Sequence, residues 1–238
     1  MKKGDARRSE LLAAAERLFY TRGYEQTSVQ DILDEIGFSK GGIYHHFDSE
    51  LSVLEAICDM RAQESCERAK QVVGEEGSAV DKLNALLNSS ALWQSENSSF
   101  VTLLIQVAYR QDSALMRERM KSCQLKSLQE TMEAVLAEGV RSGEFFVTDL
   151  QATASLLLRL YMQFTDEVAF LLAQQDQPEQ ILEEIVRRMT VYRQAIERTL
   201  IAPFGSIVLF ETKQLQLMVS AVIKSRIQRR ADEKLGLS

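Results

Sequence analysis

The chain has 238 residues, of which 45% are hydrophobic and 26% charged, and its formal net charge at pH 7 is −6. This composition is typical of a globular protein with an apolar core, and the length fits one large domain or two small ones. The net negative charge argues against a general, sequence-independent binder of nucleic acids.

The first 50 residues predict short helices separated by glycines. Residues 7–22 carry apolar side chains at helical spacing, and Gly23 follows as a stop signal. Thr27 or Ser28 offers the N-cap of a second helix, which ends at Gly37. A third short helix is predicted from Ser39 or Lys40 to His45. Two short helices joined by a tight turn form a helix-turn-helix arrangement.

The rest of the chain predicts a second helical body. Asp48 or Ser49 begins a helix that runs to about Val73, and further helices are expected at about 100–110, 114–138, 149–173 and 178–201. With only two prolines and eleven glycines, the chain predicts an all-α protein of about nine or ten helices. The expected domains are 1–50 for the helix-turn-helix, with 51–73 as a connecting helix, 74–203 for the second body, and 204–238 for an extra C-terminal helix or tail.

The tail joins an apolar body to a basic end, KSRIQRR, at residues 224–230. Three interpretations stay open: an extra helix that packs on a dimer, an interfacial membrane helix, or a non-specific DNA contact. No apolar run of about 18 residues exists, so no stable membrane span is expected. Three cysteines without a CxxC pair and the lack of a secretory signal favour the cytoplasm.

The stretches AAAERLFYTRGYEQTSVQDI and EIGFSKGGIYHHFDS carry many specific residues in fixed register. On these residues, positions 8–56 resemble the N-terminal domain of the TetR family of bacterial transcriptional regulators. The resemblance implies a three-helix DNA-binding domain followed by a helical ligand-binding and dimerisation domain. It also implies a homodimer, formed through the helices at about 149–173 and 178–201, that binds a palindromic operator on double-stranded DNA and answers to a small-molecule effector.

The second helix of such a motif lies in the major groove, and helix starts can hold phosphates. Lys40 supplies a cation, and Gly41 and Gly42 allow the backbone to approach DNA. The predicted DNA-binding residues are Thr27, Ser28, Gln30, Ser39, Lys40, Gly41, Gly42, Tyr44, His45 and His46. Tyr44 and His46 have a plainer alternative as packing residues. Adjacent helical residues diverge by about 100°, so His45 and His46 predict no metal site.

Aromatic and methionine residues of the second body are the candidates for an effector pocket, although most such residues are plain core. They are Trp93, Phe100, Tyr109, Met120, Met132, Tyr161 and Phe164. A hydrophobic effector, no cofactor and no enzymatic activity are expected, because no HExxH, GxGxxG, P-loop or CxxC motif occurs. The leading prediction is a ligand-responsive repressor. Gln30, Asp48 and Glu50 motivate an alternative, a helical interaction protein with weak or lost DNA binding.

Overall fold

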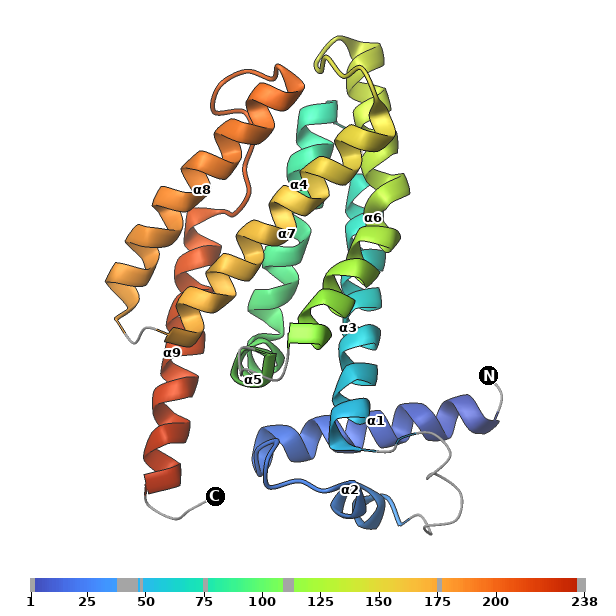
Figure 1. The fold of residues 1–238 in the computed structure, drawn as a ribbon, viewed down its shortest axis with the longest axis vertical. Coiled ribbons are helices and arrows are strands. Elements are labelled where there is room, and N and C mark those ends of the chain that lie inside the picture. The colour runs from blue at the N-terminus through green and yellow to red at the C-terminus, as the bar shows by residue number, and fades with distance from the viewer. Residues whose placement is uncertain are drawn as a thin grey trace. The chain divides into compact units, whose positions relative to one another are not determined.

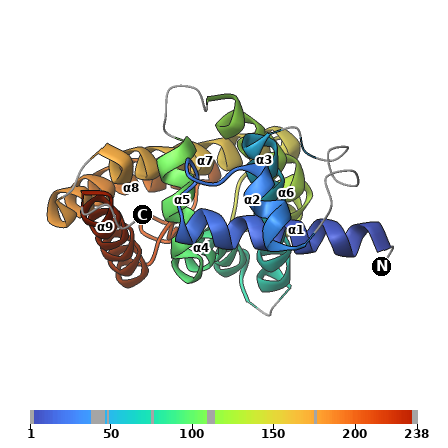
Figure 2. The same ribbon diagram turned by 90° about the horizontal axis from the view of Figure 1, so that it is seen from below.

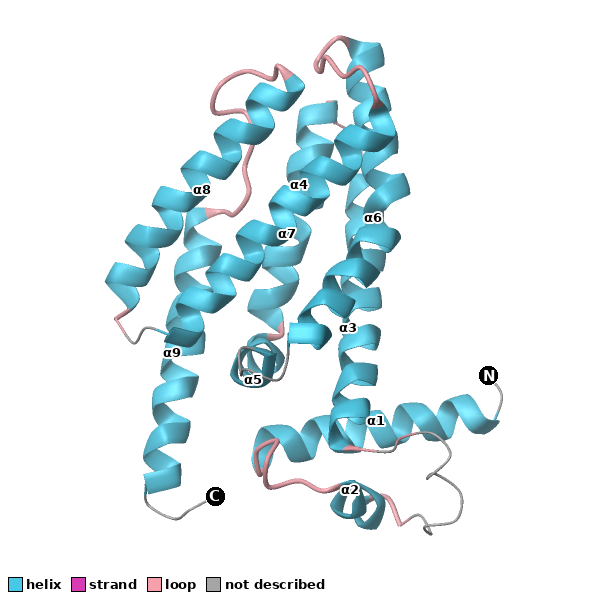
Figure 3. Cartoon of the chain, in the orientation of Figure 1, coloured by secondary structure: helices cyan, strands magenta, loops and turns pink. Residues whose placement is uncertain are grey.

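In a computed structural model of the chain, the structure describes residues 3–37, 47, 49–74, 77–108, 114–174 and 177–234. Over these residues the chain folds into nine helices joined by loops, with no strand, which confirms the all-α prediction (Figure 3). The helices, labelled in Figure 1, are α1 (Lys3–Thr21), α2 (Val29–Glu35), α3 (Glu50–Val73), α4 (Ala79–Glu96), α5 (Ser98–Ala108), α6 (Ala114–Ser142), α7 (Leu150–Gln174), α8 (Pro178–Leu200) and α9 (Thr212–Lys234).

The chain divides into two compact units. The smaller one, called the head below, comprises Met1–Arg61 together with Gln228–Ser238, and the larger one, called the body, comprises Ala62–Ile227. The boundary falls inside α3, so one continuous helix belongs to both units.

The head has an apolar core built by its first three helices. Helix α2 packs against α1, and Figure 2 shows the two helices crossing. The helical spacing of residues 7–22 supplies the part of this core on α1, where Leu11, Leu12, Ala15, Leu18 and Phe19 are buried. The other buried residues are Ile32 and Leu33 from α2, and Val53, Leu54 and Ile57 from α3.

The body is a helical bundle in which α6 packs against both α4 and α7, and α7 packs against α8. The short helix α5 lies crosswise to α4 and is seen almost end on in Figure 1. Every helix from α4 to α9 contributes side chains to one continuous core. Full burial of one Leu or Phe side chain stabilises a fold by roughly 1.5–3 kcal/mol, so this core dominates the stability of the body.

One helix is longer than expected. The sequence predicted that Gly139 would flank a turn, but α6 continues through it to Ser142. The turn is made by Gly143, which has a φ of +80° that side-chain-bearing residues rarely adopt. Gly139 serves packing instead, because a Cβ placed there would lie 2.0 Å from Cδ2 of the buried Phe145.

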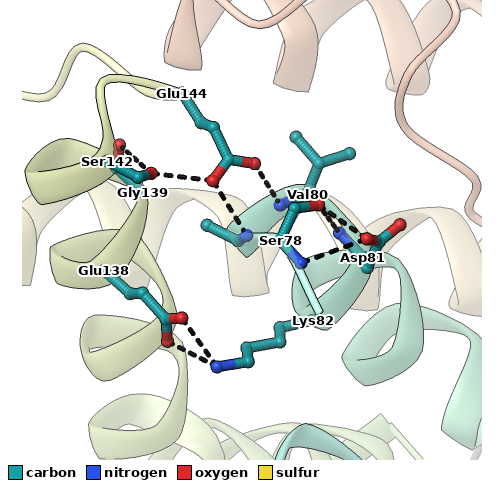
Figure 4. Close-up of polar contacts among 9 residues, drawn as sticks. Ser78, Val80, Asp81, Lys82, Glu138, Gly139, Ser142 and Glu144 are labelled. Atoms are coloured by element: carbon teal, nitrogen blue, oxygen red, sulfur yellow. Dashed lines mark hydrogen bonds and ion pairs between the residues drawn. The ribbon is translucent and has the colours of Figure 1, made fainter. Parts of the chain in front are cut away.

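The start of α4 is tied to the end of α6 by polar contacts (Figure 4). Ser78 and Asp81 form a capping box, in which the Asp81 amide donates to the Ser78 hydroxyl at 3.1 Å and the Ser78 amide donates to Asp81 Oδ2 at 3.1 Å. Glu144, from the loop after α6, accepts the backbone amides of Ala79 at 3.1 Å and Val80 at 3.2 Å. Lys82 adds an ion pair with Glu138, whose shortest N–O distance is 2.7 Å.

The tail after Pro203 is part of the body's core. Ile207, Leu209 and Phe210 are buried before α9 begins, and five apolar residues of α9 follow them: Leu215, Met218, Val219, Val222 and Ile223. Most of the apolar side chains that suggested an interfacial membrane helix are thus packed inside the protein, whereas Leu217 and Ile227 are exposed. No helix in the described ranges is long and apolar enough to cross a membrane.

Two asparagines of α4 hold the extended segment that precedes α9. The Asn84 side chain donates to the Ser206 carbonyl and accepts from the Val208 amide, each at 2.8 Å. The Asn88 side chain donates to the Val208 carbonyl at 2.7 Å. These bonds satisfy backbone groups that would otherwise be buried without partners, and they fix the path of the tail.

Candidate DNA-binding interface

The first turn of α2 is closed by a capping box. The side chain of Ser28, the N-cap residue, accepts a hydrogen bond from the Asp31 amide at 3.1 Å, and Asp31 Oδ2 accepts from the Ser28 amide at 2.8 Å. Hydrogen bonds from Ser28 also hold the pKa of Asp31 below its ordinary value. Of the two N-cap residues that the sequence allowed, the structure selects Ser28.

Thr27 has a different place. Its hydroxyl donates to the Gly23 carbonyl at 2.8 Å, and only 2% of the residue is exposed. It therefore closes the turn between α1 and α2 from the inside, whereas Ser28 is exposed.

Glu50, in the first turn of α3, reaches the start of α2. Its Oε1 accepts the Val29 amide at 3.0 Å. An acidic residue at this position is unexpected for a surface that meets phosphates, but here its carboxylate has an intramolecular partner. The Glu50 contact fastens α2 to α3, and its sequence separation of 21 residues explains why no local pattern predicts it.

Gln30 and Asp31 of α2 make further polar contacts within α2 and with the end of α1. Gln30 donates from its amide to Asp34 Oδ1 at 2.6 Å. Arg22, at the end of α1, lies 3.8 Å from the Asp31 carboxylate. Both sites are solvent-accessible, so these contacts are weak enough to exchange for other partners.

The predicted third helix, from Ser39 or Lys40 to His45, lies outside the described residues. Ser39, Lys40, Gly41, Gly42, Tyr44, His45 and His46 all fall there, and their predicted role in DNA binding stays a prediction. Just beyond them, the ring of Phe47 is buried in the head, with the Arg8 guanidinium 5.7 Å from its centroid.

The predicted pocket residues are spread over the body. Met132 and Phe164 are fully buried, and Phe100 is 3% exposed. Met120 is half-buried on α6, while Tyr109 and the side chain of Trp93 lie outside the part of the chain that the structure describes. Their role as pocket residues remains a prediction.

Two of the pocket candidates make specific contacts in the core. The Tyr161 hydroxyl donates to the Leu87 carbonyl on α4 at 2.7 Å. The Phe164 ring lies 5.4 Å from that of Tyr192 on α8 and 5.5 Å from that of Phe210 in the tail. Phe210 is a core residue that sequence reasoning missed, and the apolar run SIVLF was the available signal.

Helices α7 and α8 are also joined by charged groups. Glu167 accepts hydrogen bonds from the Tyr192 hydroxyl at 2.7 Å and from Arg188 Nη1 at 3.0 Å. Although partial burial opposes the shift, these bonds hold the pKa of Glu167 below its ordinary value. Partial burial and the bond to Glu167 raise the pKa of Tyr192 to about 12.

Comparison with known proteins identifies the head. Residues 11–57 match the family model of the bacterial regulatory proteins, tetR family. The described part of this range holds most of α1, all of α2 and the first turns of α3.

Relatives extend the similarity into the body. The fatty acid metabolism regulator protein of Bacillus subtilis is 26% identical over 146 residues, which cover 60% of this chain and 73% of that protein. The HTH-type transcriptional repressor KstR2 of Mycolicibacterium smegmatis is 29% identical over 140 residues, or 59% of this chain and 68% of the repressor.

A solved structure agrees in fold. A transcriptional regulator of the TetR/AcrR family from Thermobifida fusca superposes with a TM-score of 0.51 and 29% identity, over 76% of this chain and 97% of that one. These findings favour a DNA-binding regulator over a helical interaction protein that has lost DNA binding. The chain therefore carries, in residues 11–57, the DNA-binding domain of the TetR family of bacterial transcriptional regulators.

Proposed function

We propose that this protein is a repressor that binds a palindromic operator as a homodimer and leaves it when a hydrophobic small molecule binds in the body. The match over residues 11–57 to the family model carries the proposal. Residues 1–50 would read DNA, 51–73 connect, and 74–203 hold the effector and the dimer contact, with 204–238 as an extra C-terminal helix. Such a repressor acts in the cytoplasm, where its operator lies.

Exposed apolar residues on α7 and α8 support the homodimer. Both helices bury one face in the core and pack on each other. Leu156 on α7 is 47% exposed, and Val186 and Val191 on α8 are 41% and 63% exposed. A second copy that covers these side chains through a two-fold axis would remove them from water.

The relatives suggest which effectors to test first. One is named as a regulator of fatty acid metabolism, and a solved TetR-family structure is described as the ketosteroid regulator KstR2 of Mycobacterium tuberculosis. Fatty acyl and steroid compounds are both mostly apolar, which fits the hydrophobic effector expected for this body.

The proposal is tested by gel mobility shift of the full-length protein on DNA from upstream of its own gene. We expect a shift that weakens steeply with salt, because phosphate contacts dominate such affinities. Lys40→Ala is expected to weaken binding on every sequence, whereas the matched control Lys126→Ala, an exposed lysine of α6, is expected to leave it unchanged.

Two results would count against the proposal. If the protein binds no palindrome, the proposed repressor function is wrong. Binding that resists a panel of fatty acyl and steroid compounds would exclude those effector classes while leaving DNA binding intact.

A further inference from the structure

Glu16 is a carboxylate on the apolar face of α1. Its neighbours on that face, Leu12, Ala15 and Phe19, are buried in the core of the head, and Glu16 itself is only 6% exposed. An isolated buried carboxylate is costly, so its partners are the informative part of the site.

The partners come from α3 and from the next turn of α1. Arg61 on α3 places Nη2 2.8 Å from both carboxylate oxygens of Glu16, and its Nε lies 3.1 Å from Oε1. The Tyr20 hydroxyl donates to the same oxygen, Oε1. Burial and this bond to Glu16 raise the pKa of Tyr20, so the phenol stays protonated and remains a donor.

Stability alone does not account for this arrangement. The cost of desolvating two charges offsets most of their attraction, and apolar residues of similar size usually stabilise a fold as well. The planar guanidinium of Arg61 constrains orientation instead. Its two parallel hydrogen bonds to a carboxylate allow one relative orientation of the two helices.

The position of the pair along α3 is also specific. Arg61 is the last residue of the N-terminal segment of the head, and α3 continues from it into the body. At the other end of the same stretch, Glu50 holds the start of α2 through the Val29 amide at 3.0 Å. Helix α3 therefore makes a directional polar contact with each of the first two helices.

We propose that the Glu16–Arg61 pair is a positioning contact that fixes the angle of α1 on α3, and so sets the spacing of operator half-sites that the dimer accepts. The inference rests on the proposed function, since it needs a dimer that reads two half-sites. Movement of α3 in response to effector would then turn the head as one piece, because the fork leaves α1 no second orientation.

The test measures spacing selectivity in the full-length protein. A library of palindromes with half-site centres about 8–14 bp apart, around the one-turn spacing expected for such dimers, is offered to wild type and to Glu16→Leu/Arg61→Met. Wild type is expected to prefer one spacing by about tenfold over neighbours shifted by two base pairs. The double variant keeps an apolar contact and is expected to fold, with a preference that falls below about threefold.

Two further variants make the result specific. Lys82→Met/Glu138→Leu removes an ion pair of similar N–O distance, without a guanidinium fork, from the body and is expected to leave the spacing preference unchanged. Arg61→Lys keeps the charge but loses the fork, and an intermediate preference is expected. This single variant also provides the test if the double variant does not fold.

The outcomes separate the two ideas. If wild type selects one spacing and both Arg61 variants select it equally well, the positioning role is wrong and the repressor function stands. If wild type binds no palindrome at any spacing, the proposed function itself fails.

Discussion

Two helices of this protein begin in nearly the same way, one in each unit. Helix α2 of the head starts with Ser28 and Asp31, and α4 of the body starts with Ser78 and Asp81, each pair forming a capping box. In both cases a glutamate from another element also accepts a backbone amide of the first turn: Glu50 in the head and Glu144 in the body.

The difference lies in how the glutamate is held. Glu144 takes two amides, is steadied by the Ser142 hydroxyl at 2.7 Å, and sits on a loop 65 residues from Ala79. Glu50 takes one amide and sits on a helix 21 residues away. In the body, the Glu144 contact joins the start of α4 to the loop after α6. In the head, the Glu50 contact lies at the start of α2, which is expected to meet DNA. Parallel substitutions can therefore separate stability from binding.

The largest expected effect comes from displacing the loop that carries Glu144, because this breaks the contacts of Glu144 with the start of α4. Gly139→Ala would place a Cβ 2.0 Å from the Phe145 ring and push that loop away from α4. Overpacking of this kind costs about 1–3 kcal/mol, and the better helix propensity of Ala recovers less than about 1 kcal/mol. Urea unfolding of Gly139→Ala and of Gly139→Ala/Phe145→Ala measures the loss in the free energy of unfolding. The Ala side chain at 145 should relieve the clash, so additive losses would contradict this explanation.

Removing the glutamates themselves comes next. Glu144→Ala leaves two amides without their acceptor and should lower the free energy of unfolding by about 1–2 kcal/mol, while Glu50→Ala should cost about half as much. Denaturant titration followed by circular dichroism compares the two. Equal losses would mean that the number of amides held does not matter.

Replacing the cap serines sharpens the comparison for function. Ser28→Ala and Ser78→Ala should each cost about 1 kcal/mol, as N-cap substitutions commonly do. If Ser28 also binds a phosphate, its variant should weaken operator binding in the mobility shift, and Ser78→Ala should not. Equal operator affinities in the two variants would assign Ser28 a structural role alone.

The smallest effect is expected from pH. Hydrogen bonds, first of all from Ser28, Ser78 and Ser142, hold the pKa values of Asp31, Asp81 and Glu144 below their ordinary values of 3.8, 3.8 and 4.5. Carboxyl groups with lowered pKa values stabilise the fold above those ordinary values, and the contribution is lost as the pH falls through the folded values. Thermal midpoints should therefore begin to fall near pH 4.5. Glu144→Gln should start lower and fall less steeply, and an identical profile would exclude Glu144 as a source.

The sequence predicted the head far better than the contacts that fasten it. Helical spacing and glycine stops place α1 and α2 within a few residues, because both signals are local. The choice between Thr27 and Ser28 as N-cap needed the structure. The Thr27 hydroxyl donates to the Gly23 carbonyl in the turn after α1, and this contact depends on the path of that turn. Of the ten residues predicted to bind DNA, the three on α2 or just before it lie among the described residues.

Long-range partners mark the limit of such reasoning. Glu16 lies among the apolar residues of α1, and its burial was not predicted, because nothing local points to Arg61 as its partner. The tail is a similar case. Its apolar residues alone do not distinguish packing in the protein from a membrane interface, and the contacts with Asn84 on α4 and Phe164 on α7 decide between them.

The burial of the tail has a consequence for synthesis on the ribosome. The core residues of the head lie between Leu11 and Ile57, so they leave the ribosome early and close together in time. The core of the body waits for residues 207–223, which pack against side chains made more than a hundred positions earlier, such as Leu83 and Leu87. The head is therefore expected to be folded during translation while the body still exposes apolar helices, which is the stage at which chaperones would find this chain.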